Sequence, residues 1–135
     1  MTPQVENIDG DTGRGQSPFN LHALRTRLED DDLLQELIEL FLGNCPALLA
    51  ALETSVANRD CCAIERAAHA MKGSLRNICA DRCADAAWEL ESMGRLNDFA
   101  HAETALATLQ NELNRVRQAL QSESKIIALQ DGTPT

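Results

Sequence analysis

The sequence predicts an all-α domain, folded as an antiparallel up-and-down four-helix bundle with a short extra helix at its N-terminal end. Glycine, proline and aromatic residues are few, and Ala, Leu, Glu and Arg are abundant, which favours helices over sheet. Apolar residues recur at steps of three and four along most of the chain. Short segments separate the last four helical patterns, so neighbouring helices are expected to run antiparallel. We assign residues 19–122 to the domain, residues 1–18 to a disordered tail or linker, and residues 123–135 to a mostly disordered tail.

The first two helices are expected on either side of the acidic run 29–32. Asn20 is a residue type that caps helix N-termini. The apolar face of the helix after it is formed by Leu21, Leu24 and Leu28. A longer apolar pattern follows over residues 33–56 and contains Pro46. Because proline lacks an N–H group and clashes with the preceding turn, we expect a kink or break near Leu42.

Three further helices are expected, each beginning at an aspartate. Asp60 is the predicted N-cap of a helix that ends around residues 77–80, and Asp81 is the predicted N-cap of the next, which stops at Gly94. Trp88 lies at the edge of the apolar stripe of that helix. Asp98 caps the last helix, whose apolar seam is Phe99, Ala102, Leu106, Leu109, Leu113, Val116 and Leu120. Beyond Ser122 we expect fraying, with Ile126, Ile127 and Leu129 available for a brief packed segment.

Charge and composition exclude several classes of function. The net charge of −9 disfavours nucleic acid as a partner, because phosphate backbones require a basic surface. No stretch approaches 18 apolar residues and the N-terminus lacks a basic-then-apolar pattern, so neither membrane spanning nor secretion is expected. The five cysteines are an odd number and are expected to be reduced thiols. Their spacings do not match common zinc sites, and no metal site is predicted. We expect a cytoplasmic monomer.

One histidine is expected on the outer side of its helix. With residues 64–78 helical, an apolar stripe forms that contains Ile64, Ala67, Ala68, Met71, Leu75 and Ile78. His69 lies opposite this stripe. The residues that share its side of the helix are Cys62, Glu65, Arg66, Lys72, Gly73 and Arg76. The imidazole is therefore predicted to face solvent among charged groups.

The residues around His69 suit chemistry on a phosphoryl group. A neutral imidazole is a nucleophile near neutral pH and can carry a phosphoryl group on a ring nitrogen. Lys72, one turn away, and Arg76, two turns away, place positive charge where phosphate oxygens would lie. Gly73 costs a helix about 1 kcal/mol relative to alanine, and close approach of a partner's backbone would explain its presence.

This stretch resembles the signature of histidine phosphotransfer (HPt) domains of multistep two-component phosphorelays. The similar residues are His69-Ala70-Met71-Lys72-Gly73-Ser74, followed by Asn77, Ile78 and Ala80, and downstream Leu90-Glu91 and Gly94-Arg95. The family usually has leucine where this chain has Met71 and glycine where it has Cys79. The second difference bears on the turn after the helix and not on the phosphorylation chemistry.

The resemblance implies a mechanism. His69 would be the phospho-acceptor, attacking a receiver domain's phosphorylated aspartate through Nε2 and passing the group to another receiver. Lys72, and less directly Arg76, would offset charge on the phosphoryl oxygens, and the receiver would supply Mg²⁺. The partner would dock on Arg66, Gly73, Ser74 and Glu65. No nucleotide-binding motif appears, so the chain is not expected to be an enzyme with its own ATP site.

Two alternatives remain open. The chain could be the C-terminal phosphotransfer segment of a larger hybrid histidine kinase, with residues 1–18 as an interdomain linker. It could also be a helical bundle used only for interaction, with an idle histidine.

Overall fold

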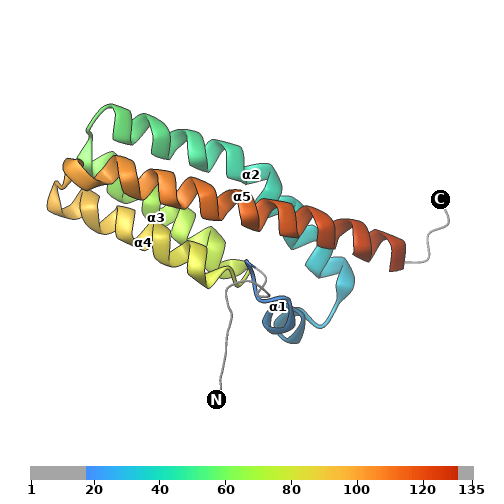
Figure 1. The fold of residues 1–135 in the computed structure, drawn as a ribbon. Helices are drawn as coiled ribbons and strands as arrows, with labels where there is room; N and C mark the ends of the chain where they lie inside the picture. Colours follow the sequence, from blue (N-terminus) through green and yellow to red (C-terminus); the bar gives the residue numbers. More distant parts are fainter. Residues whose placement is uncertain (1–17, 131–135) are drawn as a thin grey trace, which may run out of the picture.

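The computed structural model describes residues 18–130 and contains five helices and no strand in that range. The helices are α1 (Leu21–Leu28), α2 (Asp31–Ala57), α3 (Cys61–Asn77), α4 (Asp81–Leu96) and α5 (Phe99–Gln130). Figure 1 shows the four longer helices side by side, with α1 near the α3–α4 turn. The predicted all-helical class is confirmed. Of the expected tail over residues 1–18, residues 1–17 lie outside the described residues, and so do the last residues, 131–135.

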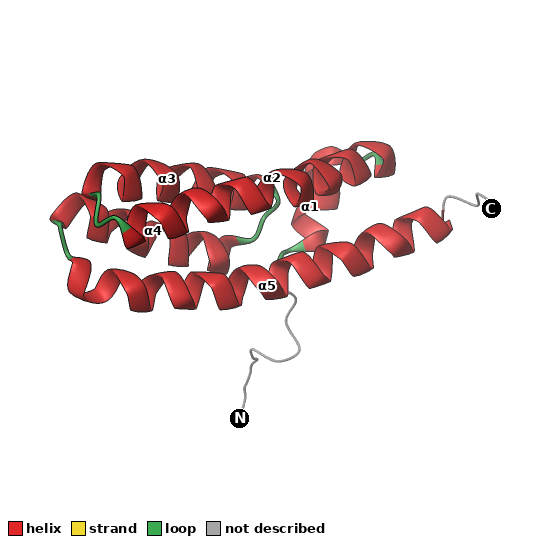
Figure 2. Ribbon diagram, turned by 90° about the horizontal axis from the view of Figure 1, so that it is seen from above, coloured by secondary structure: helices red, strands yellow, loops and turns green. Residues whose placement is uncertain are grey.

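The four longer helices close around one apolar core. Helix α3 contacts α2 and α4, and α5 contacts α4 and α2, so each long helix has two long neighbours. Helix α1 packs on α2. The largest fully buried side chains come from all five helices: Leu24, Leu34, Ile38, Leu52, Ile64, Met71, Leu75, Ile78, Leu90, Leu109, Leu113 and Leu120. Seen from above in Figure 2, α3 and α4 lie next to each other for their whole length.

Three of the four predicted caps form hydrogen bonds of the expected kind. Asn20 Oδ1 accepts from Ala23 N at 3.0 Å, and Asp60 Oδ1 accepts from Ala63 N at 3.2 Å. Asp98 Oδ1 accepts from His101 N at 3.3 Å. The prediction for Asp81 was wrong: Ala80 is the N-cap of α4, without a side-chain hydrogen bond, and Asp81 is the first helical residue. An acidic group in the first turn still interacts favourably with the positive end of the helix dipole.

The expectation near Leu42 was a kink or a break, and the break does not occur, because α2 continues through Pro46 as one helix. The kink stays a prediction. A proline removes one backbone hydrogen bond and its ring crowds the carbonyl of the preceding turn, so a helix continues through it only where other interactions compensate. Cys45 beside it and Leu52, two turns later, are buried in the core. Packing on both sides of Pro46 therefore holds the helix together.

Gly94 does not end α4, contrary to the prediction, but lies buried inside it. The helix ends at Asn97, which adopts the left-handed conformation with φ of 59°. A Cβ atom on Gly94 would lie 2.8 Å from Glu65 N and 2.9 Å from Cys61 O. The missing side chain thus allows α4 to approach the backbone of α3.

Helix α5 extends further than the predicted domain boundary at residue 122. It remains helical to Gln130, and Ile127 is buried. Two polar contacts anchor this extension: Glu123 pairs with Arg25 of α1 at 3.4 Å, and Gln35 Nε2 of α2 donates to Ser124 Oγ at 2.6 Å. The expectation that residues from 123 onward are mostly disordered is therefore wrong for residues 123–130, which are helical. They contact α1 and α2 there.

Helix α2 is long and apolar enough to cross a membrane when judged by length and composition alone. Its most apolar 18-residue window has a mean hydropathy of 1.4. A helix that builds a protein core meets the same two criteria, and residues such as Leu34, Ile38 and Leu52 are fully buried against the other helices. The length and hydropathy of α2 are therefore weak evidence for a membrane-spanning helix.

Candidate functional site

His69 lies in the middle of α3 on the side that faces away from the core. Ile64, Ala68, Met71 and Leu75 of the predicted stripe are fully buried. The His69 side chain is 69% exposed. The predicted orientation of the imidazole is confirmed, because a stripe of this width occupies the whole inner surface of the helix.

A buried carboxylate on α4 contacts this histidine. Glu91 is only 5% exposed, and its Oε2 atom lies 3.1 Å from His69 Nδ1. The Oε1 atom of Glu91 forms an ion pair with Lys72 Nζ at 2.8 Å. A third group, Arg95 Nη2, lies 3.4 Å from Oε2. Glu91 thus joins a histidine, a lysine and an arginine in one polar cluster, which we call the Glu91 cluster.

The surroundings keep Glu91 ionised. Burial by itself would raise the pKa of this carboxyl group, but the contacts with Lys72 and His69 outweigh burial and lower the pKa below its usual value. An ionised carboxylate only accepts hydrogen bonds, so Nδ1 of His69 must carry the proton in the contact between them. In the neutral imidazole the other nitrogen, Nε2, then holds the free lone pair. The Glu91 contact therefore leaves Nε2 as the nucleophilic atom.

Lys72 is not a free surface cation. Its side chain is 19% exposed, and its ammonium group is held by Glu91. Sequence reasoning placed Lys72 on the histidine face correctly, but the carboxylate that binds it comes from another helix. Its positive charge thus lies next to His69 in a fixed position.

The other predicted site residues of α3 differ in their surroundings. Arg76 is half-exposed and lies 3.7 Å from Asp85 of α4, the kind of carboxylate pairing that would draw it away from a phosphoryl group. Glu65 lies 3.3 Å from Arg95. Arg66 is exposed, and its side chain forms no ion pair or hydrogen bond within residues 18–130. Ser74 is half-buried.

Gly73 is exposed, and a Cβ atom added to it would meet no atom within 4 Å. Packing inside the protein therefore does not require glycine at this position. This contrasts with Gly94, where the backbone of α3 fills the space. The open space beside Gly73 lies on the same side of α3 as His69.

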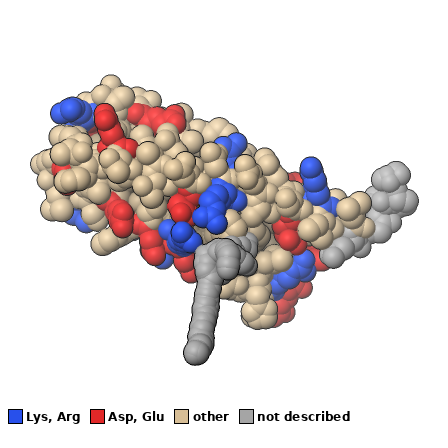
Figure 3. All heavy atoms as spheres, in the orientation of Figure 1, with Lys and Arg blue, Asp and Glu red and all other residues tan. Residues whose placement is uncertain are grey.

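The site is less basic than α3 alone suggested. Helix α3 contributes three cations and one carboxylate, but α4 adds one cation, Arg95, and two carboxylates, Asp85 and Glu91. The result is four cations against three carboxylates. On the face drawn in Figure 3, acidic and basic side chains are likewise interspersed among uncharged surface.

The other two histidines lack such a cluster. His22 is exposed on α1. His101 contacts a carboxylate, Asp98 Oδ2, at 2.9 Å, but Asp98 is the residue that caps α5, three positions away. No lysine or arginine forms an ion pair with Asp98 in the described part of the chain. A histidine–carboxylate contact alone therefore does not distinguish a site, whereas the Glu91 cluster does.

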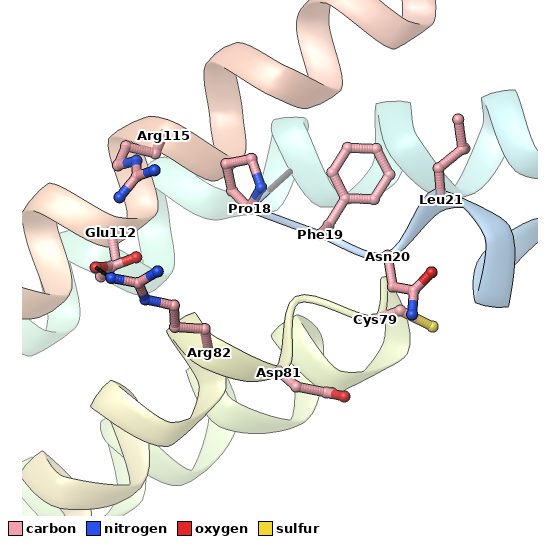
Figure 4. A pocket seen from close by; sticks show the side chains of 9 residues that line it. All are labelled: Pro18, Phe19, Asn20, Leu21, Cys79, Asp81, Arg82, Glu112 and Arg115. Carbon is pink, nitrogen blue, oxygen red and sulfur yellow. Dashed lines mark ion pairs between the residues drawn. The ribbon is translucent and has the colours of Figure 1, made fainter. Parts of the chain in front are cut away.

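One hollow in the described structure lies away from His69. It measures about 480 Å³ and lies where the segment before α1, the α3–α4 turn and α5 meet (Figure 4). Its lining includes Phe19, Cys79 and Arg115, and the ion pair between Arg82 and Glu112 at 3.5 Å. None of the predicted site residues lines it. Within residues 18–130, no group of three or more potential metal ligands is present either.

Sequence reasoning gave Glu91 no role, although it belonged to the downstream similarity. The position of Glu91 in the helical pattern could have indicated that it is buried. Glu91 follows Ala87 by four residues and precedes Gly94 by three, so it occupies the register of the buried face of α4. A charged residue at such a position needs a partner, because an unpaired buried charge is costly.

Comparisons with known proteins agree with these observations. The family model described as "Hpt domain" matches residues 36–119. A solved structure, histidine-containing phosphotransfer protein B from Pseudomonas aeruginosa PAO1, is similar with a TM-score of 0.71 and 25% sequence identity, covering 78% of this chain and 90% of that one. No curated protein matches this sequence.

Proposed function

Because the chain belongs to the Hpt domain family, it is a histidine phosphotransfer module of phosphorelays, and we propose that His69 is the residue that carries the phosphoryl group. The observation that supports this assignment is the contact between His69 Nδ1 and Glu91 Oε2. It engages Nδ1 of an exposed imidazole and leaves Nε2 as the ring nitrogen that is free to react. Hpt domains act as intermediates between receiver domains of two-component systems, so the partners are receiver domains.

The proposed transfer has two steps at one atom. The Nε2 lone pair attacks the phosphorus of an aspartyl phosphate on a receiver, a P–N bond forms, and the P–O bond breaks with its electrons leaving on the aspartate. The imidazole keeps its proton on Nδ1 and becomes positively charged. The Glu91 carboxylate stabilises that charge. A second receiver's aspartate then attacks the phosphorus, and the electrons return to Nε2.

The cations have separate proposed roles. Lys72 is held within one helical turn of His69 and offsets negative charge on the phosphoryl oxygens. Arg76 is a weaker candidate because Asp85 competes for its guanidinium group. Mg²⁺ would be supplied by the receiver, since the transferred group begins on the receiver's aspartate, and the chain would have no ATP site of its own.

The docking surface is proposed around the open space at Gly73. A receiver can approach the backbone of α3 there because no side chain intervenes. Arg66, Glu65 and Ser74 border this approach. We further infer that α2 to α5 form an antiparallel up-and-down bundle with α1 at one end, on the basis of the short connections between them, and that a monomer is sufficient.

Phosphotransfer from a labelled receiver tests the assignment of His69. The chain is incubated with a receiver domain carrying ³²P on its aspartate, and we expect acid-labile label on the chain that disappears in His69→Gln. His101→Gln is the matched control, because it removes an exposed histidine that also contacts a carboxylate. Label that persists in His69→Gln would exclude His69, and a chain that no receiver labels would support a bundle used only for interaction.

A further inference from the structure

The chain has a single tryptophan, Trp88, and its side chain is half-exposed on α4 although tryptophan has one of the largest apolar surfaces. The mechanism above does not use it. Isolated exposed apolar residues are common on protein surfaces, so exposure alone does not indicate a role. Its position relative to His69 provides the argument.

Contacts between α3 and α4 establish where Trp88 lies along the bundle. Glu65, His69 and Arg76 follow each other on α3, and their respective partners on α4 run backward, from Arg95 through Glu91 to Asp85. The two helices are therefore antiparallel. Trp88 lies midway between Glu91 and Asp85 in sequence. It is consequently level with the part of α3 between His69 and Arg76, where Gly73 lies.

Helical rotation establishes which way Trp88 faces. Residues three positions apart differ by about 60° around a helix, so Trp88 is displaced by that angle from Glu91, and by only about 20° from Arg95. Glu91 and Arg95 both point toward the exposed side of α3. Trp88 therefore lies on the outer rim of the Glu91 cluster. With about 9 Å between packed helices and about 4–5 Å of axial offset, its Cα lies about 10 Å from that of His69.

A partner that reacts with His69 must cover this position. Reacting atoms have to approach to about 3–3.5 Å, and a specific interface buries about 800 Å² on each partner, equivalent to a disc of about 16 Å radius. Trp88 falls well inside such a disc. Tryptophan is also among the residues that contribute most to binding energy at interfaces.

From these relationships we propose that Trp88 is an apolar anchor for the receiver domain that docks over His69. The inference rests on the proposed function of His69 and adds a residue of α4 to the docking surface. Within residues 18–130, the other large exposed apolar residues lie on α2 and α5, or at the C-terminal end of α4: Leu33, Leu40, Leu96, Ile126 and Leu129. None of these shares the rim of the Glu91 cluster.

Because Trp88 is the chain's only tryptophan, its fluorescence reports on docking directly. The chain is titrated with a receiver domain that lacks tryptophan and whose phosphoryl group is shown to reach His69. We expect a blue shift of the emission as the indole leaves water. Trp88→Ala is expected to raise the receiver Kd at least tenfold and Trp88→Phe less, with the rate of transfer at saturating receiver unchanged in both.

Leu129→Ala is the matched control, because Leu129 is exposed on the part of α5 that extends past α3 and α4 (Figure 1). We expect its Kd to equal that of the original chain. An unchanged emission spectrum on binding, or an unchanged Kd in Trp88→Ala, would overturn the role of Trp88 while leaving label on His69 and its function intact. If the unaltered chain acquired no label from any receiver, both the proposed function and this inference would be rejected. The spectral shift needs no variant, so the result does not depend on Trp88→Ala folding.

Discussion

His69 Nδ1 on α3 lies 3.1 Å from Glu91 Oε2 on α4, although 22 residues separate the two in sequence. The carboxylate is almost entirely buried and the imidazole is largely exposed. The contact therefore connects the interior of the bundle to its reactive surface. It also assigns the Nδ1 proton, and so the atom that is free to react.

Two substitutions of Glu91 should slow phosphotransfer to different degrees. Glu91→Gln retains an acceptor for the Nδ1 proton but removes the negative charge, whereas Glu91→Ala removes both. A hydrogen bond to a charged group is worth about 1.5–3 kcal/mol, which corresponds to about 10–100-fold in rate. We expect a loss in this range for Glu91→Ala and a smaller one for Glu91→Gln, measured by rapid-quench transfer from a phosphorylated receiver. Equal rates in all three proteins would show that Glu91 does not orient His69.

Removal of the Lys72 ammonium should affect both rate and stability. Because the side chain is mostly buried and paired with Glu91, Lys72→Ala is expected to lower the free energy of unfolding by about 1–3 kcal/mol, in addition to slowing transfer. If Lys72 were instead a fully exposed residue of α3, Lys72→Ala would leave the free energy of unfolding unchanged. Urea denaturation followed by circular dichroism distinguishes the two, with Arg66→Ala as the control for an exposed, unpaired cation of the same helix.

Acid should weaken the fold partly through Glu91. Its pKa in the folded protein is below the ordinary value of 4.5, so the unfolded chain binds more protons in this range. The stabilisation is present above about pH 4.5 and is lost as the pH falls through the lower pKa of the folded state. We expect the Tm to fall between about pH 5 and 3 more steeply than in Glu91→Gln. Parallel curves would contradict the lowered pKa. The pKa of Asp98 is also lowered, by its contact with His101, but this group is unchanged in both proteins.

The two helical glycines of the α3–α4 pair should respond oppositely to alanine. At Gly94 the new Cβ would meet backbone atoms of Glu65 and Cys61, which cannot move without separating the helices, so we expect a loss of about 1–3 kcal/mol. At Gly73 the space is open, so Gly73→Ala should stabilise the fold by up to about 1 kcal/mol through helix propensity. Thermal melts of both variants test this. A destabilised Gly73→Ala would show that the open space is not available.

The cysteines should differ in their reaction with alkylating reagents. Burial raises the pKa of Cys83 to about 12 and also raises that of Cys45, so both thiols should remain unmodified until the protein unfolds. Cys62 is exposed and should react in the folded state, although slowly, because its neighbour Cys61 raises its pKa. Peptide mass spectrometry after iodoacetamide treatment, with and without urea, measures the order. Modification of Cys83 in the folded protein would contradict its burial.

The amino-acid sequence by itself determined the helices and the outward orientation of His69. Both depend on periodicity within one segment, where apolar residues must share a face if they are to leave water. The caps at Asn20 and Asp60 could also be predicted from the sequence. In each, a side chain accepts a hydrogen bond from the backbone only three residues later, so no other helix is involved.

Only the tertiary structure decided what surrounds His69. Glu91, Arg95 and Asp85 reach α3 from α4, so no pattern within α3 indicates that Lys72 is held in an ion pair or that the site is nearly balanced in charge. The buried position of Gly94 and the helical end of α5 were mispredicted, and the sequence also left open whether α2 breaks or continues at Pro46. Each of these depends on free energy gained between helices, which outweighs the local preference of a single residue.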